Sequence, residues 1–267
     1  RASLDYIPAL WAKDGDVVLV GDIAHARRTF TRLSQQVAKY RRWHEPEVEF
    51  IEEQQLRDYA FTRINPWGWD RALAYSLRRH GVDEGLLPKA EVLQRVREES
   101  HRRTAMHLLA QIGISEAFEC STLNAIHDLI YKYNKVVAKA PWSSSGRGIR
   151  FLDDTLDEHT QGWLRNTLRH QGTVMIEPLY NKVMDFGMEF YRHPDGKVEY
   201  LGLSLFQTVN GAYTGNLLAT ETVKRDILSR YISLDDLDAF TSAACDYLGA
   251  NLSYTGPFGI DMMALEG

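Results

Sequence analysis

One lysine, Lys139, ends an apolar run and is followed at once by a loop of serines and glycines. The stretch VVAKAPWSSSGRGI, residues 136–149, therefore places a cation beside backbone that carries little side-chain bulk. Glycine permits positive φ and a close approach to a ligand, and consecutive amides can donate to phosphate oxygens. Together these features favour a polyphosphate ligand. The candidate loop residues are Ser143, Ser144, Ser145, Gly146, Arg147 and Gly148.

The chain lacks the two most familiar nucleotide motifs. It contains neither GxxxxGK(S/T) nor a GxGxxG that opens a helix, which argues against P-loop and Rossmann nucleotide binding. Taken alone, a Ser/Gly-rich segment between two strands is more often a flexible hairpin turn. A lone strand-end lysine more often snorkels into solvent. The rest of the chain must therefore supply the context for Lys139.

Two acidic residues also interrupt apolar segments. Glu177 ends the stretch TVMIE, and Asp261 lies inside FGIDMM. Asp261 is predicted to be buried, and a buried carboxylate needs a cation or full hydrogen bonding, so a magnesium ligand fits this position. The alternatives are a strand-end carboxylate at Glu177 and a hydrogen-bonded core acid at Asp261.

These residues fall on elements that the hydrophobic pattern predicts. Strands are expected at 135–139, 148–152 and 173–177, with helices between them, and Ser121 is expected to cap the helix before the first strand. Alternating apolar and polar residues then predict an antiparallel hairpin that turns at 194–196. Two helices, around 222–231 and 235–249, and a last strand at 257–265 complete the chain.

The first hundred or so residues are mixed and rich in helix. VVLVGD, residues 17–22, predicts a strand that leads into a helix, and two amphipathic stretches follow at about 70–80 and 89–112, the second broken near ESHRRT. The turn Asn65–Asp70 carries two tryptophans. Such a turn could cap a substrate pocket, although a structural aromatic corner is commoner.

Composition limits the classes of partner. A chain of 267 residues with 44% hydrophobic and 25% charged residues can bury a sizeable core and divide into more than one lobe. Its net charge of −5 gives no electrostatic reason to expect nucleic acid or an anionic membrane as a partner. Cys120 and Cys245 form neither a disulfide framework nor a zinc pattern, so a reducing cytoplasm is the simplest compartment. No apolar run approaches the about 20 residues of a membrane span.

The order of these features resembles the ATP-grasp superfamily: a basic residue on a helix, a strand lysine, a Ser/Gly loop, a Glu-Pro connection and a later strand aspartate. The resemblance covers about residues 98–263 and is carried by VVAKAPWSSSGRGIRF and TVMIEPLYNKVMDFGMEF, with GPFGIDMM in support. It implies an α/β (α+β) fold in which two lobes close over ATP. The implied parts are a mixed N-terminal region over 1–115, a small lobe over 116–180 and a large, C-terminally incomplete lobe over 181–267.

The resemblance also implies roles for single residues. Lys139 occupies the place of the strand lysine that bridges the α- and β-phosphates, and Arg102 stands where the family usually has a helix lysine. Both are therefore predicted as catalytic residues. Asp185 falls where a family carboxylate binds the ribose hydroxyls, and its alternative is the solvent face of an amphipathic strand.

The stretch IEPLY matches the family's hinge, where adenine binds to exposed backbone. Pro178 keeps a carbonyl that can accept from the adenine amino group, and Leu179 or Tyr180 can donate an amide to the ring. Glu177 would help to hold the amino group.

The implied magnesium site is incomplete within this sequence. In the family, the aspartate at the position of Asp261 works with a Glu-x-Asn pattern on the next strand, and none follows before Gly267. We expect the chain to be truncated there, and we expect residues to be missing before its abrupt start. Gly259 stands where many members carry a basic residue. The loop TVNGAYTGN lies near the implied γ-phosphate and acceptor, so Thr214 and Asn216 are the substrate candidates.

The sequence therefore predicts an ATP-dependent ligase. ATP, with Mg²⁺, would phosphorylate a small-molecule or peptide carboxylate, and a nucleophilic acceptor such as an amine would displace the phosphate. The oligomeric state stays open. The alternatives are a kinase-like phosphotransferase, a nucleotide-binding protein without catalysis, and a purely structural protein.

Overall fold

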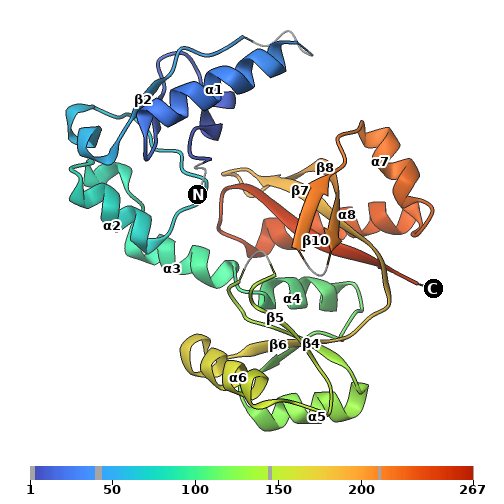
Figure 1. Ribbon diagram of the computed structural model, residues 1–267. Helices are drawn as coiled ribbons and strands as arrows, with labels where there is room; N and C mark the ends of the chain where they lie inside the picture. The colour runs from blue at the N-terminus through green and yellow to red at the C-terminus, as the bar shows by residue number, and fades with distance from the viewer. Residues whose placement is uncertain (1–3, 40–43, 144–145, 210–211, 267) are drawn as a thin grey trace. The chain divides into compact units, whose positions relative to one another are not determined.

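The computed structural model describes residues 4–39, 44–143, 146–209 and 212–266 (Figure 1). The chain divides into two compact units, Arg1–Gln94 and Arg95–Gly267. Each unit has its own buried cores, so each is described by itself. No helix among the described residues is long and apolar enough to cross a membrane.

The first unit begins with the predicted βα arrangement. Strands β1 (Val17–Leu19) and β2 (Glu49–Ile51) pair in parallel, and α1 (Ile23–Ala38) follows β1. Asp22 starts the helix because its carboxylate accepts the amide of His25 at 2.8 Å. Phe30 of α1 packs edge-on against Phe50 of β2, with ring centroids 5.7 Å apart.

Short helices complete this unit around a second apolar cluster. The remaining elements are η1 (Ile7–Leu10), η2 (Glu53–Asp58), α2 (Arg71–Arg79), η3 (Glu84–Leu86) and α3 (Ala90–Glu99), which continues into the second unit. The predicted break near ESHRRT is confirmed, because α3 ends at Glu99 and α4 (Arg103–Gln111) starts after Arg102.

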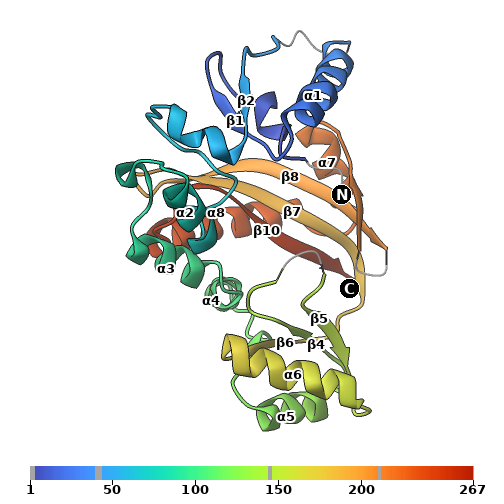
Figure 2. The same ribbon diagram turned by 60° about the vertical axis from the view of Figure 1, so that its left-hand side comes forward.

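The second unit contains a small antiparallel sheet in the order β3-β6-β4-β5. Its strands are β3 (Phe118–Cys120), β4 (Val136–Lys139), β5 (Ile149–Leu152) and β6 (Val174–Pro178). Helices α5 (Leu123–Tyr133) and α6 (Glu158–Gln171) cover one face of this sheet (Figure 2), where Ile126, Val136 and Ile176 are fully buried.

The predicted cap of α5 is wrong by one residue. Thr122, not Ser121, precedes the helix, and its hydroxyl accepts the amide of Ala125 at 3.2 Å. The extended backbone of Thr122 places its oxygen over the third helical amide, which only the residue directly before the first turn can reach.

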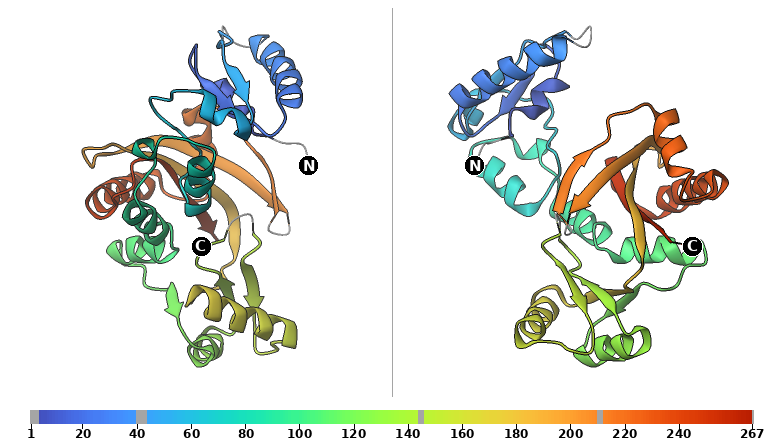
Figure 3. Two further views of the ribbon diagram at one scale, coloured as in Figure 1. Left: turned by 90° about the vertical axis from the view of Figure 1, so that its left-hand side faces the viewer. Right: turned by 45° about the vertical axis from the view of Figure 1, so that its right-hand side comes forward.

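The second unit also contains a large antiparallel sheet in the order β10-β7-β8-β9 (Figure 3). Its strands are β7 (Lys182–Arg192), β8 (Val198–Val209), β9 (Ala212–Asn216) and β10 (Gly256–Leu265). The predicted hairpin is the pair β7–β8, and the predicted last strand is β10. Helices α7 (Glu221–Leu228) and α8 (Leu234–Asn251) share an apolar core with one face of the sheet, formed around Phe186, Met188 and Phe190.

Candidate functional site

The face of the small sheet opposite α5 and α6 carries Lys139. Because side chains alternate along β4, Val136 and Ala138 enter the core while Lys139 faces the other way. Glu177 on β6 is a diagonal neighbour, since it lies opposite Val137 in the register. The Lys139 Nζ lies 2.5 Å from Glu177 Oε2, and the two side chains are 16% and 22% exposed. The cation is thus half-buried and neutralised by an acid at the end of the same sheet.

The chain leaves the small sheet through the predicted hinge. Pro178 ends β6, and Leu179 donates its amide to the carbonyl of Lys135 at 3.0 Å. The Tyr180 hydroxyl donates to Glu116 Oε2 at 2.6 Å, and burial together with this carboxylate raises the pKa of Tyr180. Since the amide of Leu179 already has an acceptor, Tyr180 is the better placed of the two candidate donors.

The two ends of the Ser/Gly loop are joined by a backbone hydrogen bond. Ala140 donates its amide to the carbonyl of Gly148 at 2.8 Å, directly after the β4–β5 pairing ends. A Cβ on Gly148 would lie 2.2 Å from the Cβ of Ser143, so only glycine fits beside this serine. Gly146 has φ +70°, a backbone conformation that favours glycine, and Arg147 is exposed. Ser144 and Ser145 lie outside the described residues.

Arg102 contacts this loop directly. Its Nε donates to the carbonyl of Ala140 at 3.1 Å, and its Nη2 donates to the carbonyl and the hydroxyl of Ser143 at 3.2 and 3.3 Å. All three acceptors are neutral oxygens. The guanidinium therefore holds the first half of the loop, at the position where the family resemblance predicted a catalytic residue.

A buried histidine and a tryptophan support the same loop, and the sequence did not single out the tryptophan. His101 is 2% exposed, and its ring meets Trp142 edge-on at 4.6 Å. Its Nδ1 accepts the amide of Arg103 at 2.9 Å, and burial, followed by the charge of Arg103, lowers the pKa of His101. Trp142 donates its indole N–H to the carbonyl of Arg97 at 2.8 Å. Burial and these contacts give His101 a structural part in this packing.

On the large sheet, Asp185 faces away from the helical core. Its Oδ2 accepts from the Thr208 hydroxyl at 2.6 Å and from Lys182 Nζ at 2.5 Å. Both bonds use one carboxylate oxygen and leave Oδ1 for a further donor. This oxygen is suited to a ribose hydroxyl.

The predicted burial of Asp261 is wrong, because its side chain is exposed. In β10 the residues that pack against the core are Phe258, Ile260 and Met262, so the alternation turns Asp261 outward. The register places it opposite Gly187 on β7, on the same face as Asp185. A period of two shows that neighbouring residues face opposite ways, but it does not show which face is covered.

Sequence reasoning missed a second carboxylate on this face. Glu189 lies opposite Gly259 in the register, and a Cβ on Gly259 would lie only 2.9 Å from Glu189 Oε2. Although the Glu189 side chain is exposed at the surface, partial desolvation of its carboxylate, followed by the negative charge of Asp261, raises its pKa. Its position four residues after Asp185 on the same strand is the signal that could have found it.

The two carboxylates have the donor chemistry that magnesium prefers. Among the described residues, no group of three or more His, Cys, Asp or Glu side chains could hold a metal by itself. Mg²⁺ is usually held by one or two carboxylates together with substrate phosphates. Asp261 and Glu189 therefore suit a metal whose remaining ligands come from a nucleotide.

The substrate candidates lie apart from these acids. Thr214 and Asn216 are exposed on β9, at the sheet edge opposite β10. Thr214 donates its hydroxyl to the carbonyl of Gln207 at 3.1 Å. The structure therefore brings together Lys139 with Glu177, and Arg102 with Ser143, but keeps β9 away from Asp261.

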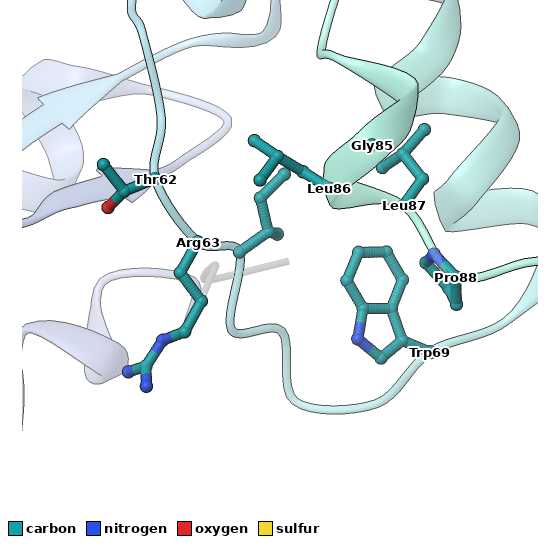
Figure 4. A pocket seen from close by; sticks show the side chains of 8 residues that line it. Thr62, Arg63, Trp69, Gly85, Leu86, Leu87 and Pro88 are labelled. Carbon is teal, nitrogen blue, oxygen red and sulfur yellow. The ribbon is translucent and has the colours of Figure 1, made fainter.

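The Asn65–Asp70 turn belongs to the first unit. Trp69 lines a cavity of about 330 Å³ with Leu86, Leu87 and Pro88 (Figure 4), whereas Trp67 is 94% exposed. Asp70 starts α2 by accepting the amide of Leu73 at 2.7 Å. The turn therefore serves both as a helix cap and as one wall of a small cavity.

No protein-family model and no curated protein matches this sequence. Solved structures do match it. Carboxyaminoimidazole synthetase from Staphylococcus aureus, complexed with ADP, has a TM-score of 0.50 and 11% identity over 94% of this chain and 67% of its own. D-alanyl-alanine synthetase A from Vibrio cholerae has a TM-score of 0.51 and 12% sequence identity, over 96% of this chain and 86% of its own. Pyruvate carboxylase from Rhizobium etli has a TM-score of 0.57 and 14% sequence identity, over 94% of this chain and 25% of its own. Likeness at such identities concerns the fold, and the chain has the α+β ATP-grasp fold.

Proposed function

We propose that this protein binds ATP and uses it to activate a carboxylate as an acylphosphate, which a nucleophile such as an amine then attacks. The observation that carries the proposal is Lys139, a half-buried cation held by Glu177 at the hinge and followed by a loop with a glycine base. Phosphate oxygens would replace Glu177 as the partner of Lys139. Glu177 would then accept from the adenine amino group.

The named neighbours support this kind of reaction. Two of them are called synthetases, one of those was solved with ADP, and the third is a carboxylase. For this chain the partners would be a small-molecule or peptide carboxylate and a nucleophilic acceptor. Thr214 and Asn216 remain the proposed contacts with them.

Each part of the nucleotide would have its own contacts. The phosphates would take Lys139 and the amides of the described loop residues Gly146, Arg147 and Gly148. Adenine would take the Pro178 carbonyl and the Tyr180 amide, and the ribose would take Asp185. Residues 116–180 and 181–267 would act as the two lobes, and residues 1–115 would precede them.

A magnesium ion would be held by Asp261, with Glu189 beside it. When bound, the ion neutralises charge on the phosphates. The protein's own contribution would be to position the reactants and to exclude water, through Lys139, the loop amides and the hinge.

The first experiment measures the melting temperature with and without ATP. A ligand that binds only the native state must raise this temperature, so we expect ATP to stabilise the wild type. Lys139→Ala should lose the stabilisation, while Lys197→Ala, which removes an exposed lysine from the β7–β8 turn, should keep it. A wild type whose melting temperature ignores ATP at millimolar concentration would contradict nucleotide binding. Equal ATP responses in the two variants would contradict the role of Lys139.

A further inference from the structure

The segment that joins α3 to α4, residues 99–103, contacts the loop after β4 of the small sheet and the residues just before β10 of the large sheet; we call it the α3–α4 junction. We propose that Arg102 is a positioning residue that fixes the Ser/Gly loop from this junction, and that Glu99 fixes the junction to the start of β10. The proposal rests on the proposed function, because only there is the loop a phosphate site.

Arg102 bonds the loop as a fork. Its Nε and Nη2 reach two carbonyls three residues apart, those of Ala140 and Ser143, and Nη2 also reaches the Ser143 hydroxyl. A planar guanidinium presents several donors in a fixed geometry, whereas a lysine ammonium is a single point charge on a flexible stem. The geometry of this contact therefore requires arginine. The positive charge of Arg102 is not what the contact requires, because all the acceptors are neutral.

Fixing Ser143 also fixes the far side of the loop. Ser143 packs where a Cβ of Gly148 would be, and Gly148 in turn accepts the amide of Ala140 at 2.8 Å. The two ends of the loop are thus locked to each other. A constraint applied by Arg102 at one end reaches the backbone at the other.

Trp142 gives the junction a second hold on the loop. Its indole donates to the carbonyl of Arg97 and lies 4.1 Å below the Arg97 guanidinium. His101, inside the junction, packs edge-on against the same ring. Consecutive loop residues, Trp142 and Ser143, are therefore held from α3 and the junction.

Glu99 bonds the junction to the residues just before β10 of the large sheet. Its Oε1 accepts the amide and the hydroxyl of Ser253, each at 2.7 Å, and its Oε2 accepts the amide of Tyr254 at 2.9 Å. These residues lead directly into β10, which starts at Gly256 and carries Asp261. Residues 99 and 102 therefore link the proposed phosphate loop to the strand of the proposed metal ligand.

Substitutions of Arg102 distinguish a direct contact with phosphate from the positioning role proposed here. A phosphate contact needs a positive charge, so Arg102→Lys would keep most of the ATP affinity, and the loop without nucleotide would not change. A positioning role, in which Arg102 holds the loop, needs the two separate donors Nε and Nη2. Arg102→Lys should then behave like Arg102→Ala and loosen the loop even without nucleotide.

The decisive experiment is hydrogen exchange on the whole chain without nucleotide. In Arg102→Lys we expect faster exchange at the amides of Ala140, Trp142 and Ser143, and a roughly tenfold weaker calorimetric Kd for ATP with unchanged affinity for adenosine. Arg95→Ala, which removes one exposed charge from α3, is the control and should match the wild type. Wild-type exchange in Arg102→Lys, or wild-type ATP affinity in Arg102→Lys alongside a loss in Arg102→Ala, would overturn the positioning role.

The proposed link from Glu99 to the start of β10 is tested with Glu99→Gln. Glu91→Gln, at an exposed position of α3, is the control. We expect faster exchange at Ser253 and Tyr254 and, through the junction, also at Ala140 and Trp142. Faster exchange confined to Ser253 and Tyr254 would overturn the coupling. Failure of the wild type to bind ATP would refute the proposed function alone, because the exchange measurements use no nucleotide.

Discussion

At the scale of single residues, the site combines side chains that chemistry selects with side chains that geometry selects. We propose Lys139 as the first kind, because a half-buried cation beside a glycine-containing loop suits a phosphate. Arg102 is the second kind, since its acceptors are neutral carbonyls and a hydroxyl. The residue pattern reveals the first kind but hides the second. The sequence does not show which oxygen atoms a basic side chain will bond.

His101 makes a prediction at this scale. Its pKa is lowered by burial and then by the charge of Arg103, with smaller effects from Glu119, which raises it, and Arg97, which lowers it. The unfolded state therefore binds the proton more tightly than the folded state. Stability should be fully present above the unfolded value of about 6.5 and should fall as the pH drops below it. Urea unfolding between about pH 5 and 8 measures this loss.

The comparison for His101 uses two substitutions. His101→Gln should flatten the fall in unfolding free energy below about pH 6.5, whereas His159→Gln, at an exposed position of α6, should keep it. An equally steep fall in His101→Gln and the wild type would show that other groups cause the acid sensitivity.

At the scale of elements, local signals placed most strands and helices correctly, and long-range contacts explain the failures. The hydrophobic pattern found β4, β5 and β6, and strand alternation found the β7–β8 hairpin. It could not show which face of β10 packs against the helical core, so the burial predicted for Asp261 was wrong. The bonds from Glu99 to Ser253 span 154 residues, and no local pattern encodes them. The same holds for Trp142, whose partners are Arg97 of α3 and Gln171, the last residue of α6.

The cap of α5 gives a test at this scale. Thr122 accepts the amide of Ala125, so Thr122→Ala should lower the free energy of unfolding by about 1 kcal/mol. Ser121→Ala, one residue earlier, should change it by less than about 0.5 kcal/mol, as exposed substitutions usually do. Denaturant unfolding of both variants measures the difference. Equal losses would mean that the helix begins one residue earlier than the structure shows.

At the scale of the whole molecule, the proposed ligand must use both sheets of the second unit. The small sheet offers Lys139 and the hinge, and the large sheet offers Asp185 and Asp261 on the face away from its helical core. A nucleotide with magnesium would join these contacts, because the base and phosphates are held by one sheet and the metal by the other. The α3–α4 junction already bonds the loop of one sheet to the start of β10 in the other. The fold therefore contains a structural link before any nucleotide binds.

Asp261→Asn tests whether the large sheet takes part. Because Asp261 is exposed, the substitution should change the free energy of unfolding by less than about 0.5 kcal/mol, so any functional loss is not a folding loss. The amide keeps the shape of the side chain but removes the charge that a magnesium ion requires. ATP should still bind through the small sheet, while the gain in affinity on adding Mg²⁺ should shrink. Calorimetric titration of ATP with and without Mg²⁺ measures this, and Asp246→Asn on α8 serves as the control for a lost surface charge. If Asp261→Asn kept the full magnesium effect, the metal would have to be held elsewhere, and the large sheet would lose its proposed part in the chemistry.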